Sequence, residues 1–389
     1  MKPAILGGDP AFNQKINIVR PVLPDFSKLS SDVVGILSSG MVTKGKYLVE
    51  FEAAIADHLK VKHAVAVSSC TTGLMLTYQG LGLSGEVIVP SFTFMATVSS
   101  LVWCGLRPVF VDVDYETTNI DPAILETKLT KNTSAIVAVH NFGNPAEISS
   151  LVEFSNRNRL RIIFDAAHGF GALYQGIPVG NQGDAQVFSL SPTKLLIAGE
   201  GGIVATNNDE LAQKIRMGRE YGNSGNYDSA FAGMNARMPE FNALLGYQSL
   251  KMLEQAATSR NETAGLFMEV LGKIPGLDFQ KVNPGNRSSY KDFSITIDSA
   301  RFGLTRDQLM RALTAENIDS RKYYDPPVHL QTAYQKYFDG LPLPKTDQLV
   351  QGSLSLPIWT NMDNRVAMII CEAIENIHGN ASVIRSVAG

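Results

Sequence analysis

Two side chains that could do chemistry stand at the ends of apolar runs in this sequence. Lys194 follows the apolar pair 187–188 and three hydroxyl-bearing residues, and the glycine-rich stretch 199–202 comes after it. Asp165 directly follows the apolar run Ile162–Phe164. Small neighbours allow a lysine to be desolvated, which lowers its pKa toward the neutral nucleophile. Enzymes that use pyridoxal 5'-phosphate hold the aldehyde on a lysine and pair the pyridinium nitrogen with an aspartate, so we assign those roles to Lys194 and Asp165. The alternative for Lys194 is an ordinary surface lysine that closes a turn.

A second candidate is an anion site in the segment 67–74, where an apolar strand leads through small residues into a helix. Backbone N–H groups at a helix start bind anions, and the hydroxyls of Ser69, Thr71 and Thr72 can add to them. A plain helix cap is the simpler alternative. The sequence contains no GxxxxGK[ST], and its GxGxxG match at 80–85 ends an expected helix instead of following a strand, so a P-loop or dinucleotide site is not supported.

Three further side chains lie near these segments. Phe94 follows an apolar strand and could stack on a flat ring, or be a core phenylalanine. His168 comes three residues after Asp165 and could contact a cofactor, or be a structural histidine. Ser189 lies five residues before Lys194, close enough for one turn to bring both to the same ligand.

Composition excludes several classes of function. The chain has 389 residues, 44% hydrophobic and 18% charged, with a net charge of -3, which gives no sign of nucleic-acid binding. Three cysteines without CxxC spacing fit a reducing compartment. We find no signal-peptide core and no run of ~18 apolar residues, so we expect a cytoplasmic protein without membrane contact. Its six histidines show no metal-ligand spacing, so we expect no metal site.

The order of apolar runs predicts an α/β fold. We expect strands near 63–67, 86–89, 108–112, 134–139 and 162–165, and helices over 72–83, 95–104 and 146–158. Such alternation is typical of a mostly parallel sheet with helices on both faces, which collects ligands outside the carboxyl ends of its strands. A long connecting helix over 239–257, a strand at 293–297 and helices at 305–316 and 366–378 indicate a smaller α+β domain. We therefore divide the chain into a large domain, 1–254, and a small C-terminal domain, 255–389. The first forty residues carry little pattern and are expected to wrap another element or a partner.

Taken together, these motifs resemble the DegT/DnrJ/StrS family of pyridoxal phosphate-dependent sugar aminotransferases. The resemblance runs from about Val42 to near the C-terminus. It is carried by the following segments: Gly45 with Phe51-Glu52, 68–71, 90–97, 108–113, 139–140, 165–168, 189–194, 199–202, 235–238, and Tyr324 with His329. The implied fold is the large aspartate-aminotransferase-like domain of fold type I, with a mostly parallel mixed sheet, plus a small C-terminal α+β domain.

The resemblance also implies roles for residues. Lys194 would be the Schiff-base lysine and proton carrier, Asp165 would pair with the pyridine nitrogen, and His168 would lie beside the cofactor. Cofactor contacts would come, besides these, from Cys70, Thr71, Phe94, Ser189 and, across a homodimer with shared active sites, Asn235. Tyr324 and His329 would line the sugar pocket, and Arg237 is a further candidate for substrate binding.

The chain departs from the family pattern at several positions. Cys70 stands where glycine is common, Ser191 where histidine is common, and Ala236 where tyrosine is common, while Tyr221 replaces a frequent histidine. Ser191 and Ala236 bear on substrate contacts more than on cofactor chemistry. Relatives with histidine in place of the Schiff-base lysine act as dehydratases, and the presence of Lys194 disfavours that branch.

The implied activity is transfer of an amino group from L-glutamate to a nucleotide-linked keto-(deoxy)sugar, with pyridoxamine 5'-phosphate as the amino form of the cofactor. Lys44, Lys46 and Arg237 could supply a basic groove for a diphosphate, although surface solvation explains the two lysines equally well. One alternative is an aminotransferase for a keto-cyclitol or another small ring ketone. The other is a non-catalytic regulatory protein that binds pyridoxal phosphate.

Overall fold

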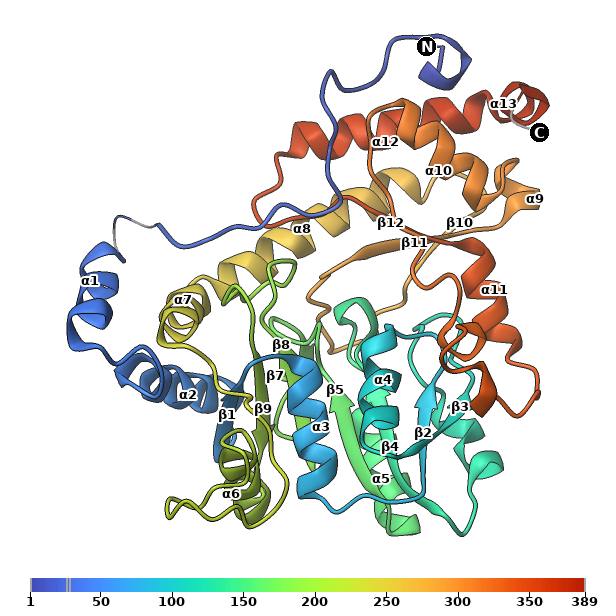
Figure 1. Cartoon of the computed structure of the whole chain (residues 1–389). Coiled ribbons are helices and arrows are strands. Elements are labelled where there is room, and N and C mark those ends of the chain that lie inside the picture. The colour runs from blue at the N-terminus through green and yellow to red at the C-terminus, as the bar shows by residue number, and fades with distance from the viewer. Residues whose placement is uncertain (1, 26, 28, 388–389) are drawn as a thin grey trace.

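A seven-stranded sheet is the centre of the larger part of the chain in this computed structural model (Figure 1). The structure describes residues 2–25, 27 and 29–387, and within them the strand order is β1-β9-β8-β5-β4-β2-β3. The strands are β1 (His63–Val67), β2 (Glu86–Pro90), β3 (Arg107–Val111), β4 (Thr133–Val139), β5 (Arg161–Asp165), β8 (Ala185–Ser189) and β9 (Gly202–Thr206). Pairing is parallel from β3 to β8, and β9 runs antiparallel to both β8 and β1. The mostly parallel mixed sheet expected from the sequence is confirmed.

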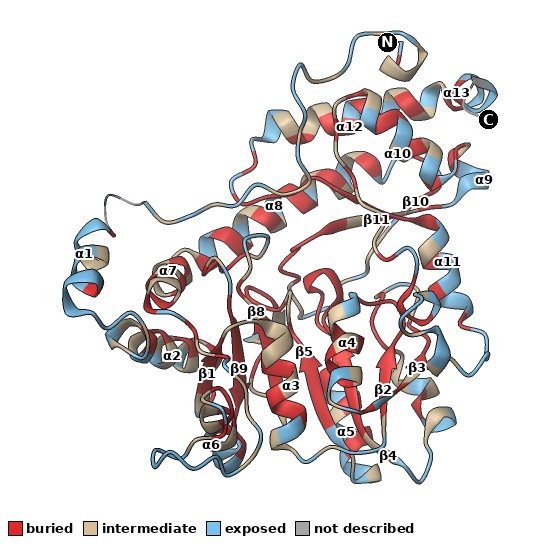
Figure 2. Cartoon of the chain, in the orientation of Figure 1, coloured by how far each residue is buried: buried red, intermediate tan, exposed pale blue. Residues whose placement is uncertain are grey.

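Helices cover both faces of this sheet because alternate strand residues point to opposite sides. In β4, Ala135 and Val137 join the core under one set of helices, and Ile136 and Ala138 join the core under the other. The first set is α3 (Cys70–Gly80), α4 (Met95–Trp103) and α6 (Asp209–Gly218). The second set is α2 (Lys46–Leu59), α5 (Ile148–Asn158) and α7 (Glu240–Leu250). Figure 2 shows the central strands buried and the outer helix faces exposed.

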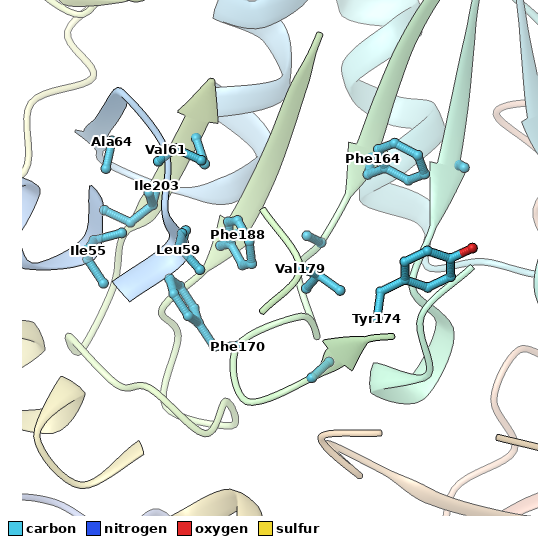
Figure 3. Packing of buried hydrophobic residues seen from close by; sticks show 14 of the residues in the cluster. Ile55, Leu59, Val61, Ala64, Phe164, Phe170, Tyr174, Val179, Phe188 and Ile203 are labelled. Atoms are coloured by element: carbon cyan, nitrogen blue, oxygen red, sulfur yellow. The ribbon is translucent and has the colours of Figure 1, made fainter. Parts of the chain in front are cut away.

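Aromatic side chains fix the two strands that end at the candidate residues. Phe188 of β8 packs on Phe170 with ring centroids 4.3 Å apart, and Phe164 of β5 is fully buried in the same core. Figure 3 shows these rings with Ile55 and Leu59 of α2 in one apolar cluster. The ends of β5 and β8 are therefore held by packing on this face of the sheet.

A second core lies in the C-terminal part of the chain. It combines a three-stranded antiparallel sheet with helices packed on it. Its elements are β10 (Leu277–Phe279), β11 (Phe293–Ile297), β12 (Ser353–Leu356), α8 (Leu253–Leu271), α9 (Ser299–Phe302), α10 (Arg306–Ala315), α12 (Asn364–Gly379) and α13 (Ala381–Val387). The smaller α+β unit expected from the sequence is present.

The N-terminal segment lies against this second core rather than against the large sheet. Ile5, Phe12 and Ile16 pack on it, and the carboxylate of Glu316 accepts hydrogen bonds from the Ala4 and Ala11 amides, each at 2.8 Å. The expectation that the first forty residues wrap another element fits this contact for the residues that the structure describes.

The long helix expected over 239–257 is wrong. The structure has two helices there, α7 and α8, because the chain turns at Lys251 and Met252, where the Met252 amide bonds the Ser249 carbonyl at 3.0 Å. Leu253 then packs in the first core and Phe267 in the second, so α8 belongs to both. The division of the chain at residue 254 stays a proposal, and it falls within the first turn of α8.

Short elements connect these layers. They are η1 (Ala4–Leu6), α1 (Ser30–Ser39), η3 (Pro122–Lys128), η4 (Asn141–Gly143), β6 (Leu173–Tyr174), β7 (Ile177–Pro178), η5 (Val328–Leu330), η6 (Gln335–Tyr337) and α11 (Pro344–Gly352). Among the described residues, no helix has the length and apolar character needed to span a bilayer.

Candidate active site

Several strands of the large sheet end at one cavity of about 410 Å³. Asp165 is the last residue of β5 and Ser189 the last of β8, while β1 leads into the loop before α3. The lining brings together eight of the residues expected from the sequence: Cys70, Thr71, Phe94, Asp165, His168, Ser189, Lys194 and Tyr324. This size and position are typical of a small-molecule site in an open α/β sheet.

Lys194 lies in the loop that joins β8 to β9. Its amide bonds the Ser191 carbonyl at 3.0 Å, and the loop is closed at its base by Leu190, whose amide bonds the Gly201 carbonyl at 3.0 Å. Burial of the amine, and next the positive charge of Lys291, lower the pKa of Lys194 to about 8. A lysine amine with a pKa near neutrality is a nucleophile suited to imine formation.

Asp165 is 5% exposed, and its carboxylate is held by neighbouring elements. Thr97 of α4 donates to Oδ2 at 2.7 Å, and the Ala167 amide donates to Oδ1 at 3.1 Å. Burial raises the pKa of Asp165 above its ordinary value, while these hydrogen bonds act in the opposite direction. A buried carboxylate fixed in this way favours a positive group beside it.

The start of α3 opens onto the same cavity. Ser69 is the N-cap: its hydroxyl accepts from the Thr72 amide at 3.1 Å, and the Ser69 amide donates to the Thr72 hydroxyl at 3.1 Å. The helix therefore begins at Cys70, two residues before the start expected from the sequence. The amides of Cys70 and Thr71 stand in the first turn, where a helix offers no carbonyl partner, and both residues line the cavity. Such a helix start binds a phosphate group.

The sheet approaches this helix start closely. A Cβ on Gly202, the first residue of β9, would lie 2.6 Å from the Cys70 amide nitrogen. The Cys70 thiol lies 3.5 Å from the Val187 carbonyl, and burial raises its pKa well above the ordinary value. Cys70 is thus a neutral thiol packed at the start of the helix.

His168 and Phe94 flank the cavity in different ways. The Nδ1 atom of His168 is buried without a hydrogen-bond partner in the described part of the chain. Burial, and next the positive charge of Lys194, keep the pKa of His168 well below its ordinary value, so the ring is neutral. Phe94 caps the start of α4 and is 50% exposed, although it is aromatic. An unpaired ring nitrogen and an uncovered aromatic face are both suited to a flat ligand with polar substituents.

A further part of the cavity lining comes from the C-terminal part of the chain, which sequence reasoning largely missed. Tyr323 and Tyr324 belong to it, with Tyr324 stacked on Phe142 at 5.7 Å and buried, so its pKa is well above the ordinary value. Lys291 and Asp292 lie beside them, and the Lys291 ammonium bonds both Asp292 oxygens at 2.8 and 3.0 Å. Two adjacent opposite charges directly before the apolar strand β11 were the available signal for this pair.

Three expected site residues lie outside the cavity lining in this chain. His329 is buried, with Nδ1 2.5 Å from the Ser91 hydroxyl and its ring packed on Phe338. Arg237 donates to Glu220 at 3.0 Å, and Asn235 is exposed. Their assigned roles stay predictions.

Lys44 shares the Glu220 carboxylate with Arg237, at 2.9 Å. Lys46 instead pairs with Glu50 at 3.7 Å on the exposed face of α2. The basic groove considered from the sequence therefore reduces to Lys44 and Arg237. Ser191 and Ala236 are two of the positions that depart from the family pattern. Ser191 lines the cavity, whereas Ala236 is fully buried and its carbonyl accepts a hydrogen bond from the Ser68 amide.

The lining fits pyridoxal 5'-phosphate on four observations. A lysine with a lowered pKa, a buried carboxylate, an open helix start and an unpaired His168 nitrogen all face one space. The described residues contain no group of three or more His, Cys, Asp or Glu side chains arranged to hold a metal ion. A lysine and an aspartate in one cavity are the donor set that pyridoxal phosphate chemistry uses.

Comparison with known proteins agrees with that class. The model of the DegT/DnrJ/EryC1/StrS aminotransferase family matches residues 27–375, so the chain belongs to this family. The chain is 33% identical to spore coat polysaccharide biosynthesis protein SpsC of Bacillus subtilis (strain 168), over 89% of this chain and 93% of that protein. It is 36% identical to GDP-perosamine synthase of Caulobacter vibrioides, over 75% and 79% of the two chains.

A solved structure shares the whole fold. The crystal structure of DesI in the presence of its TDP-sugar product is 34% identical and has a TM-score of 0.91, covering 100% of this chain and 98% of that one. The fold expected from the sequence is confirmed, and the chain is an aminotransferase of the sugar-modifying family.

Proposed function

We propose that this chain is a pyridoxal phosphate-dependent aminotransferase that moves an amino group from L-glutamate to a nucleotide-linked keto-(deoxy)sugar. The observation that carries the proposal is the shared cavity of Lys194, Asp165 and the start of α3. Its relatives support the acceptor class: one is a GDP-perosamine synthase, and the DesI structure was solved with a TDP-sugar.

Each group in the cavity has a distinct task in this proposal. Bound pyridoxal 5'-phosphate supplies an electron sink for the carbanion formed at the donor α-carbon. Lys194, with its amine neutral, takes up the proton that leaves that carbon. The Asp165 carboxylate keeps a proton on the pyridine nitrogen, and Thr97 orients that carboxylate. Phe94 covers one ring face, and the amides of α3 hold the phosphate.

Acceptor binding is assigned to the outer part of the site. Lys44 and Arg237 share the single carboxylate of Glu220, so the trio has one net positive charge. A net cation near the surface suits the diphosphate of a nucleotide sugar. Tyr324 and Tyr323 form an aromatic wall against which the sugar ring can pack.

A homodimer with shared sites is part of the proposal. Asn235 is exposed, so its side chain is available to a neighbouring subunit. Large apolar side chains are also exposed on α1 and α2: Val34, Leu37 and Val49 are each 60% exposed or more. Where such side chains form one contiguous patch, the patch marks a protein contact. The cytoplasmic location inferred from the sequence stays a prediction.

The test follows the visible absorbance of the bound cofactor. L-glutamate is added to the purified protein loaded with pyridoxal 5'-phosphate, excess donor is removed, and a panel of keto-sugar nucleotides and keto-cyclitols is offered. We expect glutamate to bleach the band and one keto-sugar nucleotide to restore it, with the amino sugar identified by mass spectrometry. Restoration only by a keto-cyclitol would overturn the acceptor assignment, and absence of bleaching would overturn the glutamate assignment.

The shared site has its own test. Lys194→Ala and Asn235→Ala subunits are each expected to be impaired alone. Mixed after reversible dissociation, they should regain activity, because one of the two sites in a mixed dimer then holds both intact residues. If mixing restores nothing while both variants form dimers, Asn235 does not act across the interface.

A further inference from the structure

Lys291 is a buried cation beside the reactive lysine, and the proposed roles above do not use it. It is 5% exposed and lines the cavity with Lys194. The two lysines also border a smaller adjoining recess together with His168 and Ser189. The charge of Lys291 acts on both Lys194 and His168, lowering the pKa of each. An anion held by Lys291 would therefore lie next to the reacting amine.

The cavity offers few other groups for an anionic donor. Among the described residues that line it, Lys194 and Lys291 are the lysines, and arginine is absent from the lining. Lys194 is committed to the chemistry. An amino acid donor carries a carboxylate on the carbon that bears its amine, and a buried carboxylate needs a charged or hydrogen-bonding partner.

We propose that Lys291 binds the α-carboxylate of the amino donor and so determines that the donor is an amino acid. This inference rests on the proposed function, since it assigns one contact of its donor. The α-carboxylate is one bond from the α-carbon, so a donor whose nitrogen is at Lys194 brings that group to Lys291. The diphosphate of a nucleotide sugar is separated from the keto carbon by the sugar ring and the anomeric oxygen, which places it farther out.

The surroundings of Lys291 keep its charge available. The Lys291 ammonium has three N–H donors. The two carboxylate oxygens of Asp292 accept hydrogen bonds from it, at 2.8 and 3.0 Å. The charge of Asp292 also acts on Arg260, a guanidinium that is 2% exposed. Lys291, Asp292 and Arg260 together carry one net positive charge. An entering carboxylate is therefore attracted, although Lys291 is already paired with Asp292.

Arg260 also fixes where Lys291 stands. Its Nη1 donates to the carbonyls of Tyr290 and Lys291, both at 3.0 Å. Since Arg260 lies on α8, the helix that joins the two cores, the lysine is placed at the cavity by the smaller core rather than by the sheet that holds Lys194. Arg260 is thus a positioning residue for the donor contact.

The experiment compares the parent protein with Lys291→Met, Lys291→Arg and the control Lys281→Met. Lys281 is an exposed lysine paired with Glu116 at 2.6 Å, so its loss removes one charge without touching the cavity. The first measurement is the concentration of L-glutamate that half-saturates bleaching of the cofactor band. The second is equilibrium binding of glutarate, measured by calorimetry on protein whose Lys194–cofactor link has been reduced with borohydride.

We expect Lys291→Met to weaken the binding of both glutamate and glutarate about 10- to 100-fold, because one charge-assisted hydrogen bond to a buried carboxylate is lost. Lys291→Arg should restore binding to within about 5-fold, because the guanidinium keeps the charge and binds carboxylates. Lys281→Met should equal the parent. The half-saturating concentration of a keto-sugar acceptor should not change in Lys291→Met, since the acceptor has no α-carboxylate.

Two results would overturn the inference: a Lys291→Met protein with parental glutamate and glutarate binding, or one that loses acceptor and donor affinity equally. Melting temperature and cofactor content of each variant identify a folding defect, and Lys291→Arg then still tests the charge. If the parent protein is not bleached by glutamate at any concentration, the proposed function fails, and glutarate binding alone still decides whether Lys291 holds a carboxylate.

Discussion

The floor of the cavity differs from the proposed acceptor surface outside its lining, called the rim below, in how firmly the chain holds the side chains. On the floor, Asp165 is 5% exposed and bonded to Thr97 and to a backbone amide. At the rim, the Lys44 side chain is 54% exposed and pairs with the same carboxylate as Arg237. Exposed positions tolerate substitution at little cost in folding free energy, whereas buried, bonded ones do not. A family that keeps one reaction and varies its acceptor can therefore change its rim and leave its floor intact.

The largest expected effect is at the floor. Lys194→Ala removes the group that binds the cofactor and carries the proton, so turnover should fall by at least about 10⁴-fold. Mass spectrometry of the product from glutamate and the keto-sugar measures it. Lys281→Ala is the matched control and should leave turnover unchanged. A fully active Lys194→Ala protein would falsify the assignment.

A smaller loss is expected from the carboxylate and its hydrogen-bond donor. Asp165→Asn should lower turnover about 10²- to 10³-fold, because a neutral amide no longer stabilises the protonated ring nitrogen. Thr97→Val should cost about 10-fold, since it removes the 2.7 Å hydrogen bond. That bond lowers the pKa of Asp165, so its loss raises this pKa and moves the acid limb of the pH–rate profile to higher pH. If the acid limb of Thr97→Val does not shift, the Thr97 hydrogen bond does not control the ionisation of Asp165.

The pH dependence of cofactor capture sharpens the description of the floor. Only the neutral amine of Lys194 forms an imine, and its pKa is about 8. The capture rate of pyridoxal 5'-phosphate by cofactor-free protein should rise about tenfold per pH unit below that value and level off above it. Lys291→Met removes a charge that lowers this pKa, so the midpoint should move to higher pH. A midpoint near the ordinary lysine pKa in the parent would contradict the burial of the amine.

The smallest effect is expected at the rim. Arg237→Ala should raise the KM for the nucleotide-sugar acceptor about 5-fold, as expected for one partly exposed charge, and leave the glutamate half-reaction unchanged. Lys46→Ala, whose side chain is 70% exposed, is the control and should change the KM less than about twofold. Steady-state kinetics with each substrate varied separately measure both. Equal loss in both half-reactions would place Arg237 on the floor rather than on the rim.

Sequence reasoning located the floor because its residues follow apolar strands that end at one edge of the sheet. Asp165 and Lys194 were found in this way, and the α/β fold came from the same alternation of strands and helices. The start of α3 was placed two residues late because the Ser69–Thr72 capping box looks like a turn in the sequence.

The part of the lining that comes from the C-terminal part of the chain could not be found by the same route. Lys291, Asp292 and Tyr323 line the cavity with Lys194, although each lies more than ninety positions from it in the sequence. Their sequence neighbourhood carries no strand end that points to the site. His329 was selected by family position alone, and it lies outside the lining and bonds Ser91, so its role stays a prediction.

Helix α8 has a consequence for exchanging parts between related enzymes. Its first turns pack in one core through Leu253 and Ala257, and its last turns pack in the other through Phe267 and Leu271. A hybrid protein joined inside this helix would set two foreign surfaces against each other. If the two parts are joined instead at Lys251 and Met252, the junction lies where the chain already turns between α7 and α8. The transferred part would then contain α8, Arg260 and Lys291 together. The donor contact would then travel with the smaller core, while the acceptor rim at Lys44 and Arg237 would stay with the host.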